Sequence, residues 1–156
     1  EPARKGMEEA LEGGILAGFP MIDVKVELYD GSYHAVDSSE LAFKVATEQA
    51  FKKGFMDAGP VLLEPIATLS VIVPDEFTGA VMGDLNKRRA RILGMNPLEN
   101  GDQEIVADIP YLELYEYDTS LFSMTRGSAD FSYEFARYEQ APQEVAKAEI
   151  ENNKEE

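Results

Sequence analysis

The order of strand-like and helix-like patterns between residues 66 and 138 constrains the fold of this chain most strongly. Runs in which apolar and polar residues alternate indicate strands, whereas apolar residues three and four positions apart indicate helices. The patterns follow one another as strand, helix, strand, strand, helix, strand. The six segments are 66–73, a helix that begins at 74 and includes Leu85, then 91–95, 103–109, 110–125 and 130–138. This order predicts a split βαβ unit, in which an antiparallel sheet carries two helices on one face.

The first 65 residues have a different pattern. Residues 4–17 predict a helix, and residues 22–28, in which apolar and polar side chains alternate, predict a half-buried strand. A second helix follows Asp37, which we expect to be its N-cap in a capping box with Glu40, and it ends at Gly59-Pro60. The loop 30–37 is therefore predicted to project between a strand and a well-capped helix.

These patterns together predict an α+β chain with three parts. Residues 1–65 form a partial α/β domain, with Pro65 as the joint to the next domain. Residues 66–138 form a ferredoxin-like βαββαβ domain, whose last strand places Phe131, Tyr133 and Phe135 on the side expected to face the core. Residues 139–156 form an acidic C-terminal tail that we expect to be partly helical or disordered. The six glutamates of this tail are Glu139, Glu144, Glu149, Glu151, Glu155 and Glu156.

The charge balance restricts how this chain binds a nucleic acid. Its 14 Lys and Arg residues against 30 Asp and Glu residues give a formal net charge of −16, whereas phosphate neutralisation needs clustered cations. The one basic island consists of Lys87, Arg88, Arg89 and Arg91. Cations near a helix C-terminus also favour the helix dipole, so this island has a structural interpretation as well as an RNA-binding one.

Several classes of protein are excluded or made less favourable by composition. Without cysteine, the chain has no disulfides, no thiolate chemistry and no Cys-based zinc site. No apolar run approaches the ~20 residues of a membrane span, and the first residues lack the apolar segment of a signal peptide. Because the sequence does not begin with Met, we expect it to be a piece of a longer protein.

No constellation of residues predicts catalysis or metal binding. Ser32, His34 and Asp37 are too close in sequence to favour a catalytic triad. Asp30, His34 and Asp37 lie in a predicted loop, so no pair of them has the helical i, i+4 placement of a metal site. The phosphate-loop motif G-x-x-x-x-G-K-[ST] is absent. Gly79 and Gly83 lie one helical turn apart with no lysine after them, so we expect helix packing and no GTP binding there.

Several stretches of the sequence, in the same order along the chain, resemble elongation factor G. They cover nearly the whole chain to about residue 142, and this co-linearity is more specific than any one motif. The stretches are 16–26, 30–34 with 36–40, 42–44 with 50–52, 59–66, 83–86 with Arg88-Arg89 and Gly94-Met95, and Ser123-Met124-Thr125 with Gly127 and Phe135. The chain therefore resembles the end of domain IV followed by all of the ferredoxin-like domain V of bacterial elongation factor G or a divergent paralogue.

The resemblance implies a role in protein synthesis. It implies that a tip loop of Gly31, Ser32, Tyr33 and His34 reaches the decoding region of the small ribosomal subunit as tRNA and mRNA move. It also implies contact with the sarcin–ricin loop of the large subunit through a second set of residues, Phe122, Ser123, Met124 and Arg126. The aromatic ring of Phe122 suits stacking on a base, although its helical position is equally typical of a core residue.

The resemblance also implies that the chemistry of the protein lies outside this chain. No catalytic residue, metal or cofactor is expected here, whereas the parent protein would bind GTP and Mg²⁺ through a G domain. The chain is expected to be cytoplasmic and monomeric, to bind the ribosome and tRNA, and not to bind membranes. Gly31 to His34 carry no large positive charge, so their contact with RNA is expected to be positional.

Departures from the family pattern keep other functions open. The family usually has Arg at the position of Phe122, Gly at Ala90, Gly-Tyr-Ala at 116–118 and Gln-Gly-Arg-Gly at 126–129. These differences indicate a divergent paralogue as an alternative to a standard translocase. Two further alternatives are a ribosome recycling or protection factor of the same superfamily and a stand-alone ferredoxin-like binding module.

Overall fold

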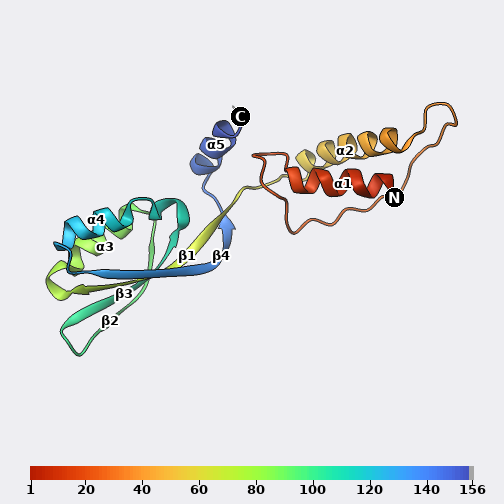
Figure 1. The fold of residues 1–156 in the computed structure, drawn as a ribbon. Coiled ribbons are helices and arrows are strands. Elements are labelled where there is room, and N and C mark those ends of the chain that lie inside the picture. The colour runs from red at the N-terminus through yellow and green to blue at the C-terminus, as the bar shows by residue number, and fades with distance from the viewer. Residues whose placement is uncertain (155–156) are drawn as a thin grey trace. The chain divides into compact units, whose positions relative to one another are not determined.

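The computed structural model describes residues 1–154, which divide into two compact units (Figure 1). The second unit is Leu63–Gln140, and the first contains the residues on either side of it. β1 begins at Leu63, so Pro65 lies inside this strand and not at the joint that we expected. At Pro65 the strand pairs only with β4, because its pairing with β3 begins at Ile66. A proline, which lacks the N–H donor, is tolerated where one side of a strand has no partner.

The second unit contains a four-stranded antiparallel sheet with the order β2-β3-β1-β4. Its strands are β1 (Leu63–Pro74), β2 (Arg91–Pro97), β3 (Asp102–Pro110) and β4 (Asp130–Gln140). Leu69 of β1 lies opposite Ala107 of β3 and Tyr133 of β4. The predicted βαββαβ order is confirmed, and each strand begins or ends within three residues of the expected position.

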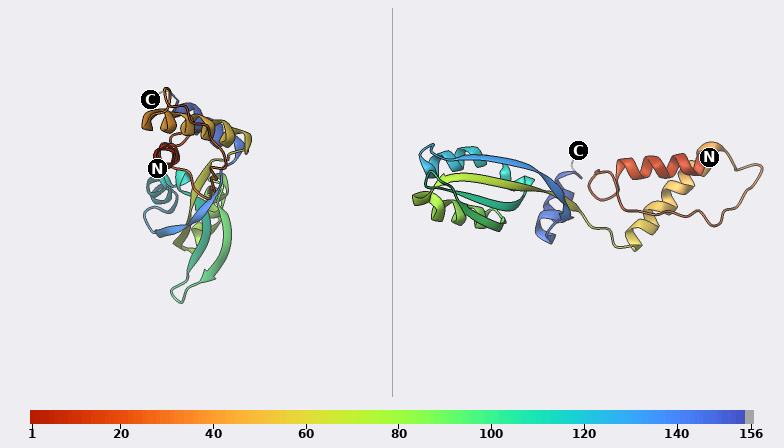
Figure 2. Two further views of the ribbon diagram at one scale, coloured as in Figure 1. Left: turned by 90° about the vertical axis from the view of Figure 1, so that its right-hand side faces the viewer. Right: turned by 90° about the horizontal axis from the view of Figure 1, so that it is seen from below.

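Helices cover one face of this sheet (Figure 2). They are α3 (Thr78–Lys87), which follows the short 3₁₀ turn η1 (Asp75–Phe77), and α4 (Tyr117–Thr125), which follows the 3₁₀ turn η2 (Tyr111–Leu114). Leu69 and Val71 of β1 are fully buried with Leu85 of α3 and Tyr117 of α4. The core therefore lies between the sheet and these two helices.

Two expectations for this unit need correction. The helical stretch 110–125 is interrupted, because Glu116 between η2 and α4 has a left-handed backbone with φ of 53°. Of the three β4 aromatics expected in the core, Phe131 packs against it, but Tyr133 and Phe135 are 50% and 52% exposed. β4 is an edge strand, so side chains along it have fewer neighbours than those of the central strands.

The first unit contains the helices α1 (Pro2–Gly13) and α2 (Glu40–Asp57), which lie side by side. Gly6 is buried where α1 approaches α2, and a Cβ at this position would lie 2.6 Å from the Lys44 carbonyl oxygen. α1 ends four residues earlier than predicted. Gly14 adopts φ of 66° there, and the chain folds back so that the Met21 amide donates to the Leu11 carbonyl.

The strand predicted at residues 22–28 does not form. Its alternating apolar side chains are exposed, from 36% for Val26 to 72% for Leu28. A strand requires hydrogen bonds to a neighbouring strand, and the sheet of the described residues consists of four strands of the other unit. The alternation therefore indicates what this segment is suited to form, but no strand among residues 1–154 pairs with it.

The predicted acidic tail begins after β4 and is largely helical. Its helix, α5, is Gln143–Asn152, and it belongs to the first unit. Glu139 belongs to β4. Glu155 and Glu156, which are part of the predicted tail, lie outside the described residues.

Candidate functional site

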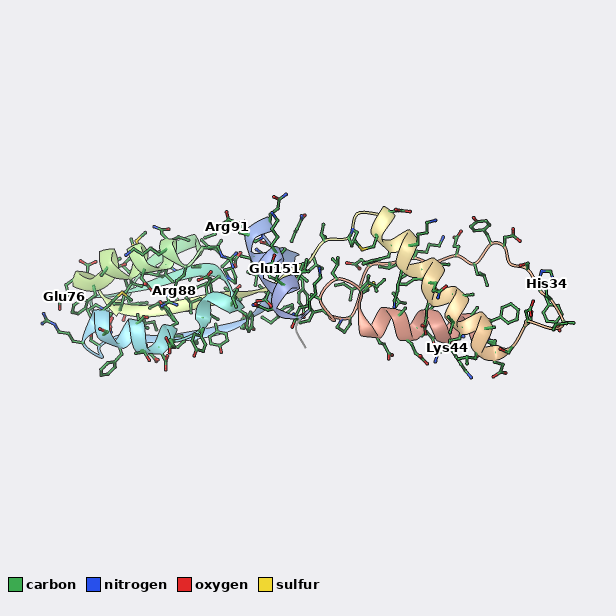
Figure 3. All side chains as sticks on the ribbon, turned by 90° about the horizontal axis from the view of Figure 1, so that it is seen from above. His34, Lys44, Glu76, Arg88, Arg91 and Glu151 are labelled. Atoms are coloured by element: carbon green, nitrogen blue, oxygen red, sulfur yellow. The ribbon has the colours of Figure 1, made fainter. Side chains whose placement is uncertain are left out.

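The loop that precedes α2 carries the predicted tip residues, and a compact turn closes it. The Ser38 amide donates to the His34 carbonyl oxygen at 2.9 Å, and the His34 amide donates to Ser38 Oγ, also at 2.9 Å. Before this turn, the Gly31 amide donates to Asp30 Oδ1 at 2.8 Å. These bonds hold the backbone on both sides of Ser32 and Tyr33. His34 itself is exposed on the part of the loop that extends past the first turn of α2 (Figure 3).

The start of α2 anchors this loop, although not through the predicted cap. Ser39, and not Asp37, is the N-cap, and its Oγ accepts a hydrogen bond from the Ala42 amide at 3.0 Å. Asp37 instead belongs to the turn, where its amide donates to the His34 carbonyl. The ring of Tyr33 stacks on Phe43 of α2 at 6.4 Å between centroids, with the ring planes 6° apart. Tyr33 therefore connects the loop to the helix while 71% of it remains exposed.

The second predicted contact set lies on α4. Leu121 and Thr125 face the core and are buried, whereas Phe122, Ser123 and Arg126 are exposed and Met124 is half-buried. Phe122 is 69% exposed, which excludes the core position that its helical pattern allowed. We name the group Phe122, Ser123, Met124 and Arg126 the α4 surface.

The end of α4 is shaped by two left-handed residues. Arg126 has φ of 54°, Gly127 has φ of 77°, and the Gly127 amide donates to the Phe122 carbonyl at 3.0 Å. A Cβ on Gly127 would lie 2.6 Å from the Phe122 ring. The ring of Phe122 therefore rests against this turn while its other side stays open to solvent.

The residues of the predicted basic island do not form one free patch. Lys87 is exposed, but the Arg88 side chain is only 17% exposed and makes four hydrogen bonds within the second unit. Arg89 pairs with Glu64 at 2.8 Å and Glu113 at 3.0 Å. Hydrogen bonding to Glu64 raises the pKa of Arg89 further above its ordinary value. Arg88, Arg89 and Arg91 thus each have a carboxylate partner within the unit.

Arg91 belongs to a cluster on the face of the sheet that the helices leave open. Its Nη2 donates to Asp108 Oδ2 at 2.8 Å, and Arg137 Nη2 donates to the same oxygen at 2.7 Å. Asp108 is 6% exposed, and Thr68 Oγ1 donates to its other carboxylate oxygen at 3.4 Å. Burial works to raise the pKa of Asp108, but the two arginines outweigh it and hold the pKa below its ordinary value.

Sequence reasoning missed Asp108, Arg137, Glu64 and Glu113 as partners of the island. Their separations from it are 17 to 46 positions, so no local pattern brings them together. For Asp108 the strand register does so: Arg91 lies opposite Asp108 in the β2–β3 pair, and Asp108 lies opposite Thr68 in the β1–β3 pair. A correct strand alignment would have been the signal for Asp108.

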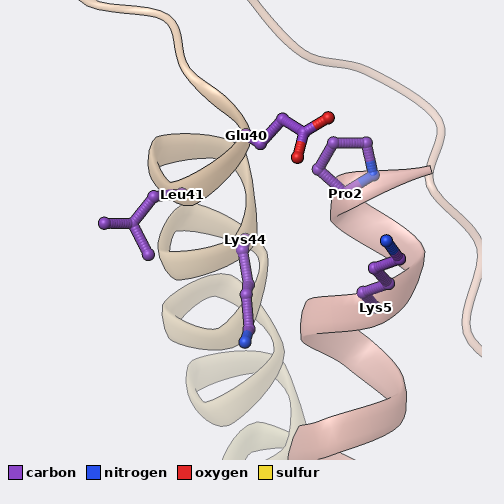
Figure 4. Close-up of a pocket in the computed structure, with 5 residues that line it drawn as sticks. All are labelled: Pro2, Lys5, Glu40, Leu41 and Lys44. Carbon is purple, nitrogen blue, oxygen red and sulfur yellow. The ribbon is translucent and has the colours of Figure 1, made fainter.

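A shallow depression lies between the first turns of α1 and α2, lined by Pro2, Lys5, Glu40, Leu41 and Lys44 (Figure 4). The Lys44 ammonium is committed to an ion pair with Glu9 of α1 at 2.5 Å, which joins the two helices. Across residues 1–154, no group of three or more His, Asp or Glu side chains is placed to hold a metal ion. No helix in the same range has the length and apolar character needed to cross a bilayer.

Known proteins match both units. The family description "Elongation factor G, domain IV" matches residues 1–59, and "Elongation factor G C-terminus" matches residues 61–149. A crystal structure of a protein from Thermus thermophilus is similar over 99% of this chain, with 42% sequence identity and a TM-score of 0.80. The matched region is 23% of that protein's chain, so the present chain spans about a quarter of its length.

Proposed function

Because the chain belongs to the elongation factor G family, we propose that it is the ribosome-contacting, C-terminal part of a GTPase that promotes tRNA–mRNA translocation. One observation carries this proposal: a domain IV match over residues 1–59 is followed directly by a C-terminal match over 61–149. A ferredoxin-like fold alone hosts many functions, whereas this pair of domains in this order is specific.

In this proposal the loop around His34 contacts RNA in the small subunit. The exposed imidazole offers a ring nitrogen donor or acceptor, and the neighbouring Tyr33 offers an aromatic face. The stack of Tyr33 on Phe43 and the turn at His34–Ser38 limit how far the loop moves relative to α2. A restrained loop with little positive charge is suited to occupy space next to RNA more than to neutralise phosphates.

The α4 surface would contact the sarcin–ricin loop of the large subunit. The exposed Phe122 ring is available for stacking on an unpaired base, and the nearby Arg126 carries one positive charge. Because the Arg89 and Arg91 guanidiniums already have carboxylate partners, electrostatic attraction to the RNA backbone would be small here.

The chemistry of the cycle would lie outside this chain. We propose that GTP and Mg²⁺ bind to a G domain elsewhere in the parent protein, and that these residues act as a lever that the nucleotide state positions. In that case the chain itself is no enzyme and needs no cofactor. A monomer that works on cytoplasmic ribosomes follows from the same proposal.

A divergent paralogue, with a role in ribosome recycling or protection, is the second candidate. The observation that favours it is the non-glycine residue Glu116 at a left-handed position where the family usually has Gly. Phe122 also puts an exposed aromatic ring where the family usually has Arg, while Arg126 stands where it usually has Gln. These changes lie near the proposed large-subunit contact, and the proposed small-subunit tip is unchanged.

Translocation assays on the parent protein test the main proposal. We expect His34→Ala to slow tRNA movement several-fold while ribosome-stimulated GTP hydrolysis stays nearly intact, because the tip acts after the nucleotide site. Val36→Ala is the matched control, since Val36 is 94% exposed in the same loop and offers no polar group. Equal loss of translocation and hydrolysis in His34→Ala would contradict the tip role.

Ribosome footprinting of the chain itself separates the proposal from the stand-alone module. The proposal requires protection of bases in the decoding region and in the sarcin–ricin loop. A chain that dimerises and protects no ribosomal RNA would instead favour the binding module.

A further inference from the structure

Arg88 connects α3, η2 and α4 of the second unit through one guanidinium group. Its Nε donates to Asp84 Oδ2 within α3 at 2.8 Å. Its Nη1 donates to the backbone carbonyls of Glu113 at 2.7 Å and Tyr115 at 3.3 Å, which lie in and just after η2. Its Nη2 donates to Ser120 Oγ in α4 at 2.7 Å. The guanidinium carbon also lies 5.2 Å from the centre of the Tyr117 ring, a cation–π distance.

These bonds fall at the N-terminal corner of α4, where no side-chain cap holds the helix. α4 has nine residues, and its N-cap, Glu116, makes no side-chain cap hydrogen bond. Glu116 also has a left-handed backbone, which a non-glycine residue adopts at a cost unless its surroundings enforce it. By holding the Tyr115 carbonyl before this residue and Ser120 after it, Arg88 fixes both sides of the corner at which α4 begins.

Arg88 is poorly placed to bind phosphate itself. Its side chain is 17% exposed, and its four hydrogen bonds leave few of its five N–H groups for a ligand. A lysine at this position would keep the charge but could not make the same planar, forked set of bonds. The contribution of Arg88 to any ligand contact therefore passes through α4.

We propose that Arg88 is a positioning residue for the α4 surface, setting the orientation in which Phe122 and Arg126 meet ribosomal RNA. This inference rests on the proposed function for the contact itself. The orientation of α4 in the free protein does not depend on that function. The basic-island interpretation assigns Arg88 to phosphate binding. In this proposal Arg88 instead orients α4.

The test uses the whole chain with four variants. Arg88→Lys keeps the charge and removes the fork, and Arg88→Met removes both. Lys87→Met is the matched charge control, because Lys87 is the exposed neighbour. Ile92→Ala, on the edge strand β2, is the control for lowered stability away from α4. Each variant is measured by amide chemical shifts of the free chain and by affinity for purified bacterial ribosomes at several KCl concentrations.

The proposal expects Arg88→Lys and Arg88→Met to weaken ribosome binding alike, by about tenfold. In both free variants the amides of residues 117–127 should shift, while those of β2 and β3 stay in place. The dependence of log affinity on log salt should keep its slope, because no phosphate contact is lost. Ile92→Ala should leave both the α4 amides and the affinity at their wild-type values.

Other results would overturn the positioning role. Retained affinity in Arg88→Lys with loss in Arg88→Met, or a salt slope lower by ~1 in Arg88→Met, would make Arg88 a phosphate ligand. Unmoved α4 amides in both Arg88 variants would also overturn it. Failure of the wild-type chain to bind ribosomes would refute the proposed function, and the α4 amides would still decide whether Arg88 sets this surface.

Discussion

Replacing Glu116 by glycine should stabilise the second unit. Glu116 has φ of 53° and ψ of 22° at the corner between η2 and α4, and its side chain is exposed. A left-handed backbone costs an L-residue with a Cβ roughly 1–2 kcal/mol, whereas glycine adopts it freely. Part of this gain is offset because glycine makes the unfolded chain more flexible. We therefore expect Glu116→Gly to raise the free energy of unfolding by about 1 kcal/mol.

Thermal and urea unfolding of the whole chain measure this change. For a domain of this size, 1 kcal/mol corresponds to a rise in Tm of about 4–8 °C. The chain carries a net charge of −16, so removing one carboxylate alone could also be favourable. Glu116→Gln controls for charge, because glutamine removes the charge but keeps the Cβ, and it should change Tm little.

Asp118→Gly is the second control, since it places a glycine two residues away. Asp118 is exposed, lies in the first turn of α4 and has an ordinary helical backbone. Glycine there should cost about 1 kcal/mol because it weakens the helix. If Glu116→Gly were no more stable than Glu116→Gln, or if both glycine variants lost stability alike, the strain assigned to Glu116 would be refuted.

Three other changes test separate parts of the structure. Asp108→Asn should lower the free energy of unfolding at pH 7 by about 1–2 kcal/mol, because two arginines lose a charged acceptor, although both are partly exposed. The pKa of Asp108 is lower in the folded state than in the unfolded state, so this stabilisation is present above the unfolded-state pKa and disappears as the pH falls through the folded-state pKa. In an acid titration, the stabilities of wild type and variant should therefore converge below about pH 4. Tyr117→Phe should leave stability unchanged or raise it by up to about 1 kcal/mol in urea unfolding, because the hydroxyl is buried and has no hydrogen-bond partner among the described residues; a loss above that size would mean that the hydroxyl is bonded. Gly14→Ala should disrupt the turn after α1, because the new Cβ would lie 2.2 Å from the Phe19 carbonyl oxygen, and hydrogen exchange at Met21 would detect the opening.

The sheet unit was predictable because its own sequence contains both sides of every strand pair. The alternation in 66–73 and 103–109 marks the faces that become buried, and these two segments pair with each other. Local pattern also located α2, but it chose Asp37 as the N-cap over Ser39. Both residues are good caps, and only the backbone shows that Asp37 is used in the turn closed by Ser38.

The strand expected at 22–28 illustrates the opposite case. Alternation there is as regular as in the sheet unit, yet the segment forms no strand and stays exposed, because a strand forms only when two segments pair. The tip loop could be recognised despite this, since its own turn and the cap of α2 hold it locally. A local prediction therefore holds where the bonds that stabilise the element are also local.

The same distinction separates the two candidate surfaces. The loop around His34 is held by hydrogen bonds between residues no more than four positions apart, so its conformation depends on its own sequence. The α4 surface depends on Arg88, whose bonds reach residues 25 to 32 positions away. A substitution of Arg88, or of its partner Asp84 in α3, would therefore alter the α4 surface without changing any residue on it. Divergence of this family member at residues 90 and 116, outside the α4 surface, thus bears on how α4 is presented, and the sequence of α4 alone does not determine its contact with RNA.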